Sequence, residues 1–276
     1  MFKFKGLRAT ATLPAANLTP AETPKDPGAY YDAIAESYHY FFRDWTAAMQ
    51  RESGVLRRLY RDRDVRDVLD ASCGVGTQAI ALALNHYEVT AADPSPKMLL
   101  KAQENARHHG VADDITFVKA DFLALPRTVI GPYDAVITKG NALPHLITDA
   151  EWLAALRGFY DLLRPGGLLT IGMRDFDLLL EDRPRFVPRH LHDADPSQDV
   201  IVFDVYDWQD TDPLTVTFNT FLVSGKGDDY AVTRFPVTYR AITRDEAVGL
   251  VMAAGFTDVQ ANTESWELIL NAVRPT

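Results

Sequence analysis

The sequence predicts an α/β protein built on a doubly wound sheet that is mostly parallel, with an antiparallel last strand and an antiparallel β insertion. Two observations favour this fold: short apolar strands alternate with helical segments from about residue 65, and a glycine-rich turn follows the first strand. Such alternation produces βαβ units with parallel strands and right-handed crossovers. The expected strands are 66–70, 87–92, 115–119, 133–138 and 167–173, separated by helices near 75–85, 95–109 and 149–163.

Two short helices are expected before the first strand. Ala, Thr and Pro dominate residues 9–27 without an apolar period, so residues 1–28 are expected to form a flexible N-terminal tail. Apolar and aromatic residues then recur at helical spacing, which predicts helices over 29–45 and 46–62. One domain is therefore expected over residues 29–276.

The pattern changes after the fifth strand, where segments rich in Val, Phe, Thr and Tyr are separated by polar turns. These segments are 199–208, 213–223 and 230–240, followed by a helix at 244–254 and strands at 257–262 and 266–273. They predict an antiparallel insertion over 199–240. An insertion at this place would cover the ligand-binding edge of the sheet as a lid. The alternative is a purely structural extension of the sheet.

The composition favours a globular protein that acts on small molecules. The 276 residues are 47% hydrophobic and 24% charged, and their net charge of −10 argues against a nucleic-acid partner. The single cysteine excludes an internal disulfide, and the chain contains no secretory signal or bilayer-length apolar run. We therefore expect a cytoplasmic protein without membrane association. No ligand spacing indicates a metal, and a homo-oligomer stays open.

A glycine-rich turn and several carboxylates indicate a cofactor site. Gly74 and Gly76 follow the first strand, and glycine lets a ligand approach the backbone closely. Asp93 ends the second strand, where a carboxylate can accept hydrogen bonds from both hydroxyls of a ribose. The polar residues expected at the carboxyl ends of the strands are Asp70, Asp93, Asp121 and Lys139. This Rossmann-like arrangement predicts an adenosine-containing cofactor.

Two cofactor classes fit the glycine turn. Gly74, Gly76 and Ala79 satisfy the G-x-G-x-x-A pattern of dinucleotide-binding proteins, so a nicotinamide cofactor stays open on that pattern alone. Asp70 opposes it, because a carboxylate beside the turn would repel a pyrophosphate but would accept a hydrogen bond from an ammonium group. The acidic strand ends therefore favour a neutral or cationic ligand.

The ordered motifs of residues 65–175 resemble those of class I S-adenosylmethionine-dependent methyltransferases. The motifs are the glycine turn, Asp93-Pro94-Ser95-Pro96-Lys97-Met98-Leu99, Asp121-Phe122 and Leu163-Arg164-Pro165-Gly166-Gly167. The resemblance implies S-adenosyl-L-methionine as the cofactor, with its methionine part on the loop Ala71–Gly76 and its ribose on Asp93. It also implies that Met98 packs on the adenine and that Asp121 and Phe122 contact the adenine edge.

A second stretch is similar to glycine N-methyltransferases and their glycine/sarcosine relatives. It comprises the residues Thr138-Lys139-Gly140-Asn141-Ala142-Leu143-Pro144-His145-Leu146 and Gly167 to Asp177. The resemblance implies that Asn141 and Arg174 hold an amino-acid substrate, with the arginine on its carboxylate. That family usually has a serine after the asparagine, whereas this chain has Ala142. The departure favours the amino-acid class over glycine itself.

Aromatic and basic residues complete the predicted site. Tyr31 and Tyr239 are expected at the substrate and Tyr38 at the cofactor, where aromatic faces attract a sulfonium or a methylated amine. The alternative is that these rings only pack a helix and a strand. Arg51 is expected at the cofactor carboxylate, and Lys139 also at the cofactor. His145 is a candidate base, although a structural histidine is equally compatible with its place.

The resulting hypothesis is an S-adenosylmethionine-dependent N-methyltransferase of a small amine or amino acid, including glycine- or sarcosine-like acceptors. Methyl transfer from a sulfonium is an in-line displacement that depends on orientation and desolvation. One alternative is an O- or C-methyltransferase in a biosynthetic pathway, with Arg174 paired to another acidic group. Others are a non-catalytic partner subunit with the same fold, and a dehydrogenase.

Overall fold

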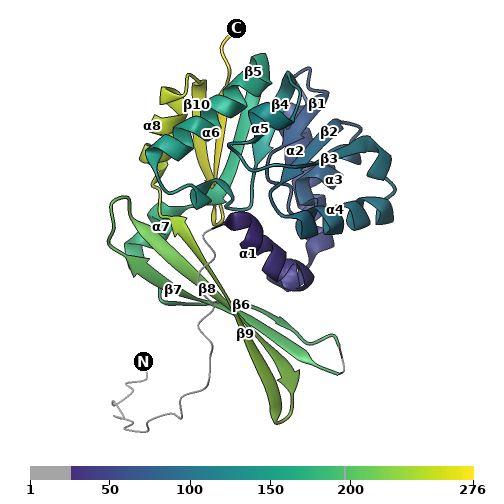
Figure 1. The fold of residues 1–276 in the computed structure, drawn as a ribbon, viewed down its shortest axis with the longest axis vertical. Coiled ribbons are helices and arrows are strands. Elements are labelled where there is room, and N and C mark those ends of the chain that lie inside the picture. The colour runs from purple at the N-terminus through teal and green to yellow at the C-terminus, as the bar shows by residue number, and fades with distance from the viewer. Residues whose placement is uncertain (1–25, 196) are drawn as a thin grey trace.

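A seven-stranded sheet forms the centre of the protein in the computed structural model, which describes residues 26–195 and 197–276 (Figure 1). The strand order is β10-β11-β5-β4-β1-β2-β3, and β11 runs antiparallel to its neighbours β5 and β10. The strands are β1 (Asp67–Asp70), β2 (Glu88–Asp93), β3 (Ile115–Lys119), β4 (Tyr133–Thr138), β5 (Leu163–Arg174), β10 (Thr257–Glu264) and β11 (Glu267–Val273). The predicted doubly wound sheet with an antiparallel last strand is confirmed.

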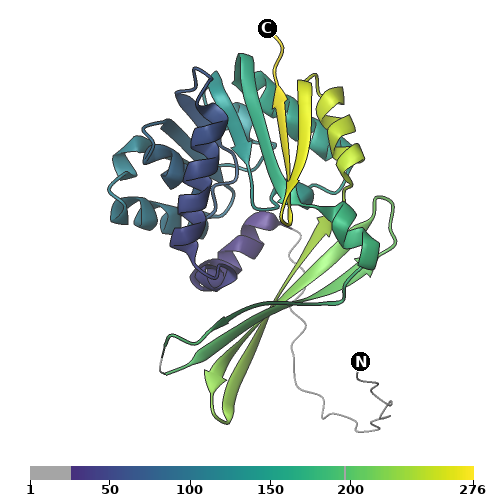
Figure 2. The same ribbon diagram turned by 180° about the vertical axis from the view of Figure 1, so that it is seen from behind.

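Helices cover both faces of this sheet, as the opposite views of Figures 1 and 2 show. On one face, Leu56 and Tyr60 of α2 belong to the same hydrophobic cluster as Ile80 of α3. On the other, Phe159 of α6 and Val251 of α8 belong to a second cluster. The helices are α2 (Trp45–Tyr60), α3 (Thr77–Ala83), α4 (Pro96–His108), α5 (Leu125–Thr128), α6 (Asp149–Leu162) and α8 (Arg244–Ala253), with short 3₁₀ turns η2 (Ala112–Asp114) and η3 (Leu143–His145).

The N-terminal helices differ from the expected pair. The predicted helix over 29–45 is instead a short helix α1 (Pro27–Ile34) followed by a 3₁₀ helix η1 (Ala35–Phe41). Phe42 is extended, and the Asp44 side chain caps α2 by accepting a hydrogen bond from the amide of Ala47. The helical conformation is therefore interrupted between η1 and α2. Of the predicted flexible tail 1–28, residues 1–25 lie outside the described residues.

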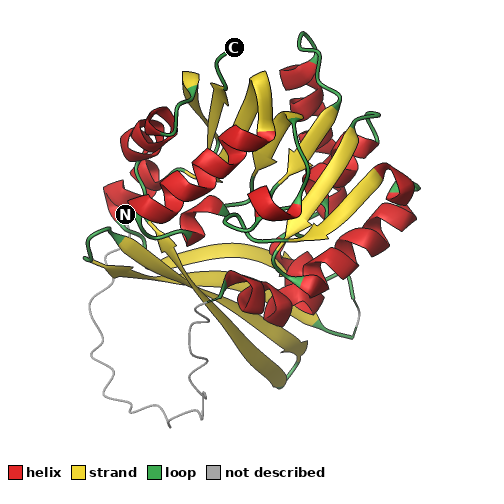
Figure 3. Ribbon diagram, turned by 45° about the horizontal axis from the view of Figure 1, so that its top comes forward, coloured by secondary structure: helices red, strands yellow, loops and turns green. Residues whose placement is uncertain are grey.

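The expected insertion is a four-stranded antiparallel sheet, which we call the lid sheet. Its strands are β6 (Phe186–His192), β7 (Asp199–Gln209), β8 (Thr215–Lys226) and β9 (Asp229–Arg240), and a short helix α7 (Phe176–Asp182) precedes it. Strand β6 was not predicted. It carries Pro188 at a register irregularity on the edge of the sheet, which hides the alternation typical of a strand. Figure 3 shows the lid sheet crossing one side of the α/β core.

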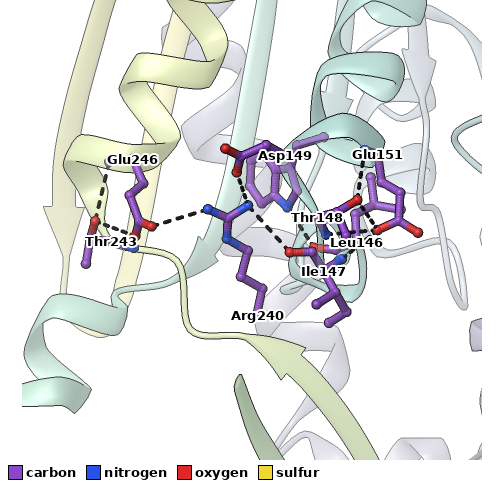
Figure 4. Close-up of polar contacts among 9 residues, drawn as sticks. Leu146, Ile147, Thr148, Asp149, Glu151, Arg240, Thr243 and Glu246 are labelled. Atoms are coloured by element: carbon purple, nitrogen blue, oxygen red, sulfur yellow. Dashed lines mark hydrogen bonds and ion pairs between the residues drawn. The ribbon is translucent and has the colours of Figure 1, made fainter. Parts of the chain in front are cut away.

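Arg240, at the end of β9, fastens the lid sheet to the core (Figure 4). Its guanidinium lies 2.5 Å from the Asp149 carboxylate and 3.2 Å from the Glu246 carboxylate, at the first turns of α6 and α8. Thr148 and Thr243 cap these two helices, each in a capping box. The C-terminal end of the lid sheet is therefore anchored to the first turns of α6 and α8.

No helix in the described ranges is long and apolar enough to cross a membrane.

Candidate functional site

The glycine turn lies between β1 and α3 and is fixed by its neighbouring strands. The amide of Ala71 donates to the carbonyl of Ile137 at 2.8 Å, and that of Cys73 donates to the carbonyl of Ala92 at 2.9 Å. Gly74 and Gly76 have φ of +52° and +91°, which favour glycine. A Cβ on Gly74 would meet no atom within 4 Å, so the turn faces open space. This space is the candidate cofactor site.

Two buried carboxylates lie beneath the turn. Asp93 accepts hydrogen bonds from the amides of Gly74 and Ser95, both at 2.9 Å, and burial raises its pKa to about 6. Asp70 accepts one from the amide of Ser72 at 3.3 Å, while its Oδ2 is buried without a partner. Burial raises the pKa of Asp70 to about 7. A cationic ligand near these groups would favour their ionised forms.

The first cavity has a volume of about 380 Å³ and opens above the glycine turn. Most residues predicted to bind the cofactor belong to its wall: Tyr38, Arg51, Ala71, Gly74, Asp93, Asp121, Phe122 and Lys139. Asp70, Gly76 and Met98 are not part of this wall, and Asp70 and Met98 are almost fully buried. The structure thus brings the strand-end residues together, and their roles toward the cofactor stay predictions.

The far end of this wall is formed by the segment after β3. Oδ1 of Asp121 accepts hydrogen bonds from the amides of Leu123 and Ala124, at 2.9 and 2.7 Å, and so fixes the turn before α5. The ring of Phe122 packs edge-on against Phe159, with 5.6 Å between centroids. Hydrogen bonds to the turn thus hold the exposed side chain of Asp121, and ring packing holds that of Phe122, at the cavity.

Lys139 lies in the same wall, but two glutamates hold its ammonium group. Its Nζ is 2.8 Å from Glu52 of α2 and 3.2 Å from Glu267 of β11, and the side chain is only 3% exposed. Burial opposes the charge, yet the two carboxylates outweigh it and raise the pKa of Lys139. This ion-paired group packs directly on Gly172, where a Cβ would collide with Glu267 and would lie 2.7 Å from Lys139 Cε. No sequence signal pointed to either glutamate.

A second cavity of about 920 Å³ adjoins the first, and the two share wall residues such as Tyr38, Gly140 and Trp266. Its wall includes all four residues predicted to bind the substrate, namely Tyr31, Asn141, Arg174 and Tyr239, and residues of β6, β8 and β9. Strands β8 and β9 of the predicted insertion 199–240 thus line this cavity, together with β6, which lies outside the predicted bounds.

Asn141 and Arg174 lie together at the junction of the cavities. Asn141 has φ of +67°, and its Oδ1 accepts a hydrogen bond of 3.0 Å from the amide of Arg174. Its Nδ2 is buried without a partner. The guanidinium of Arg174 lies 4.9 Å from the ring centroid of Trp266 and 5.7 Å from that of Phe218. Trp266, which sequence reasoning missed, lies in the turn between β10 and β11.

Arg174 makes no ion pair with any carboxylate of the described residues. A guanidinium held on aromatic rings, with an amide donor beside it, suits a carboxylate ligand. The described part of the chain contains no cluster of His, Cys, Asp or Glu that could hold a metal ion.

An aromatic group surrounds His145 beside this junction. The hydroxyl of Tyr31 lies 3.1 Å from His145 Nε2, and the ring of Tyr239 lies 4.7 Å from the imidazole centroid. Burial lowers the pKa of His145 to about 4 and raises the pKa of both tyrosines. His145 is therefore neutral near pH 7 and is a weak base.

The sequence is similar to those of known methyltransferases. Residues 68–167 match the model of a methyltransferase domain. The chain is 36% identical over 138 residues to a glycine/sarcosine N-methyltransferase of Parasynechococcus marenigrum, covering 50% of this chain and 48% of that relative. It is 32% identical over 166 residues to human glycine N-methyltransferase, covering 56% of each. The chain thus spans about half the length of the curated relatives it matches.

Solved structures resemble the whole fold. The CcbJ methyltransferase of Streptomyces caelestis has a TM-score of 0.74 at 20% identity, covering 91% of this chain and 100% of its own. CalS10, an S-adenosylmethionine-bound amino pentose methyltransferase of Micromonospora echinaspora, has a TM-score of 0.72 at 20% identity, covering 88% and 96%. The methyltransferase domain matched over residues 68–167 and the overall fold are similar to those of class I S-adenosylmethionine-dependent methyltransferases. Within this class, its sequence relatives include glycine and glycine/sarcosine N-methyltransferases.

The residues around the first cavity fit S-adenosylmethionine. The unpartnered Oδ2 of buried Asp70 and the carboxylate of Asp93 suit a cationic ligand, and the open space over Gly74 admits one. Arg51, on α2, reaches both cavities and is suited to a carboxylate. S-adenosylmethionine, when bound, supplies an electrophilic methyl group on a sulfonium.

Proposed function

We propose that this protein transfers a methyl group from S-adenosylmethionine to the nitrogen of a small amine or amino acid. The observation that carries the proposal is the pair Asn141 and Arg174, where a buried amide nitrogen without a hydrogen bond lies beside a guanidinium that makes no ion pair with the described residues. This pair lies in the second cavity, which adjoins the cofactor cavity. The N-methyltransferase relatives support the same reaction.

The residues of the second cavity would bind and orient the acceptor. Arg174 would pair with its carboxylate, and Asn141 would donate a hydrogen bond from Nδ2. The rings of Tyr31 and Tyr239 would exclude water from the path between the acceptor nitrogen and the methyl carbon. An amine must be neutral to attack, and burial lowers the pKa of an ammonium group, so the free base is favoured without a strong protein base.

An amino sugar is a second candidate acceptor. The second cavity, at about 920 Å³, is large for an acceptor of the size of glycine, since cavities of ~300–1,000 Å³ hold drug-sized ligands. Among the proteins of similar fold are an amino pentose methyltransferase and KedS8, a sugar N-methyltransferase with a TM-score of 0.68 at 16% identity. A neutral amino sugar would not need the charge of Arg174, which separates the two candidates.

We also propose that residues 29–276 form one catalytic unit, in which the lid sheet encloses the acceptor. The protein would act in the cytoplasm, and its substrate would be a small molecule rather than a nucleic acid. The net charge of −10 supports a small-molecule substrate. An O- or C-methyltransferase, the remaining alternative, would act on phenols or enol acids and leave amines unchanged.

The test is a screen of amino acids, amino sugars, amines and phenols with S-adenosylmethionine, read by product mass. We expect methylated amines and no methylated phenols. Arg174→Met should raise the KM for an amino-acid acceptor at least about tenfold, because a charge-assisted bidentate pair is lost. The Kd for S-adenosylhomocysteine should stay within about twofold.

Arg183→Met is the matched control, since Arg183 also lies over a tryptophan ring, Trp208, at 5.8 Å but outside both cavities. It should leave KM unchanged. Methylation of phenols alone would overturn the proposed acceptor class. A loss of S-adenosylhomocysteine binding in Arg174→Met would show that the division between the two cavities is wrong.

A further inference from the structure

The second cavity contains more positive charge than one acceptor carboxylate requires. Four arginines belong to its wall, and the only acidic residue there is Asp44. Oδ1 of Asp44 already accepts the amide hydrogen of Ala47 at the start of α2. The protein as a whole has a net charge of −10, so this excess of cations is local. The arginines are Arg43, Arg51, Arg174 and Arg189.

These arginines belong to two groups. Arg51 belongs to the walls of both cavities, and Arg174, in the wall of the second cavity, contacts Trp266, which belongs to both. Arg43 and Arg189 belong only to the second cavity, where the turn after η1 meets β6, together with His190. We call Arg43, Arg189 and His190 the cationic end of the second cavity.

Arg189 is held in place by a backbone carbonyl and an aromatic ring, and it has one distant carboxylate partner. Its Nη2 donates to the carbonyl of Phe41 at 3.2 Å, and its guanidinium lies 5.3 Å from the centroid of that ring. Oδ2 of the buried Asp204 lies 3.8 Å from its Nη1, a long ion pair, while Oδ1 of Asp204 accepts a 2.7 Å hydrogen bond from Thr220. Several N–H groups of Arg189 thus keep their capacity to donate.

Of the other two members of the cationic end, Arg43 adds positive charge, whereas the lowered pKa of His190 keeps its ring neutral near pH 7. Arg43 is exposed and makes no ion pair within residues 26–195 and 197–276. Burial lowers the pKa of His190, and the charges of Arg189, His192 and Arg43 lower it further, so these groups lie within electrostatic range of one another. Nothing in the proposed transfer of a methyl group to a small amine uses this cluster.

We propose that the cationic end binds an anionic group of the acceptor, a phosphate or a carboxylate, distinct from the group that pairs with Arg174. This inference rests on the proposed function and narrows its substrate class. The acceptor is then an extended amine that spans the second cavity, with its nitrogen near Asn141 and an oxyanion on Arg43 and Arg189. The size of the cavity, about 920 Å³, accommodates such a molecule.

The test measures anion binding by isothermal titration calorimetry on the protein saturated with S-adenosylhomocysteine, at constant ionic strength. Inorganic pyrophosphate probes the phosphate form of the ligand, and glutarate probes the carboxylate form. We expect at least one of them to bind the wild-type protein. The double variant Arg43→Gln/Arg189→Gln should raise its Kd at least about tenfold, since charge-assisted hydrogen bonds are lost.

Two single variants make the test specific. Arg43→Gln alone should raise the Kd at least about threefold, and it disturbs neither the Phe41 contact nor the Asp204 pair of Arg189. Arg185→Gln is the matched control, because Arg185 is 70% exposed, pairs with Asp207 at 3.1 Å and lies outside the cavity wall. It should leave the Kd unchanged.

The outcomes separate this inference from the proposed function. If S-adenosylhomocysteine binds but neither anion does, or if the Arg43→Gln and double variants bind the anion as tightly as Arg185→Gln, the cationic end is not an anion site. The proposed function would survive that result. Failure of the wild-type protein to bind S-adenosylhomocysteine would instead contradict the proposed function itself.

Discussion

Asp70 and Asp93 are the residues whose ionisation should control the cofactor cavity. Burial raises the pKa of Asp70 to about 7 and that of Asp93 to about 6. A carboxyl whose pKa is higher in the folded state than in the unfolded state binds more protons when folded. These two groups therefore lower the stability of the free protein as pH rises from about 4 to about 7. A bound cation offsets this loss, because it favours the ionised carboxylates.

We therefore expect the preference for S-adenosylmethionine over S-adenosylhomocysteine to increase with pH. The two ligands differ by the sulfonium charge, and the neighbouring carboxyls ionise between about pH 6 and 7. The ratio of the two dissociation constants, measured by calorimetry, should change about tenfold between about pH 5 and 8, which corresponds to roughly one pKa unit of coupling. Asp70→Asn should flatten this dependence. An equally steep ratio in Asp70→Asn would exclude that residue as its source.

At the scale of single residues, position along the chain accounts for the residues at the strand ends but not for those that reach the cavities from distant parts of the sequence. The turn Ala71–Gly76 follows β1, Asp93 ends β2 and Phe122 comes three residues after β3, so position along the chain fixes their place at the edge of the sheet. Trp266 and Glu267 lie in the β10–β11 turn and at the start of β11, more than ninety residues after β5, and their approach to Arg174 and Lys139 depends on how β11 pairs with β5. No local sequence pattern predicts how β11 pairs with β5.

At the scale of secondary-structure elements, Lys139 joins three segments that each carry a residue of the proposed site. Glu52 follows Arg51 on α2, Lys139 precedes Gly140 and Asn141 after β4, and Glu267 follows Trp266 at the start of β11. The ammonium group thus fixes the relative positions of these segments. Strand β6 is the strand that sequence patterns missed, because Pro188 interrupts its alternation, and it brings Arg189 to the second cavity; the short helices α5 and α7 were not predicted either.

Lys139→Met should destabilise the protein by about 3 kcal/mol, because it leaves two largely buried carboxylates without a partner. The triple variant Lys139→Met/Glu52→Gln/Glu267→Gln should recover at least about half of this loss, since the carboxylate charges are gone. Urea unfolding measures both values. Lys101→Met is the control: its ion pairs with Glu36 and Glu104 are largely exposed, and its removal should change stability by less than about 1 kcal/mol. Equal effects of the two single changes would contradict the assigned role of Lys139.

At the scale of the whole molecule, the two cavities share one set of wall residues. Tyr31, Tyr38, Arg51, Gly140 and Trp266 belong to both, and they come from the N-terminal helices, the β4 turn and the β10–β11 turn. The lid sheet adds the remaining side of the second cavity and is fastened by Arg240 to the starts of α6 and α8. Ligands in the two cavities should therefore influence each other through this shared wall.

We expect S-adenosylhomocysteine to raise the affinity for the acceptor found in the screen at least about fivefold, and the acceptor to raise S-adenosylhomocysteine affinity by the same factor. Trp266→Ala should reduce the coupling free energy to less than about half of its wild-type value, because Trp266 contacts Arg174 and belongs to the walls of both cavities. Trp208→Ala should leave it intact, since Trp208 supports Arg183 outside the cavities. Calorimetric titration of each ligand, with and without the other, measures the coupling. Equal coupling in both variants would mean that the cavities communicate by a route other than Trp266.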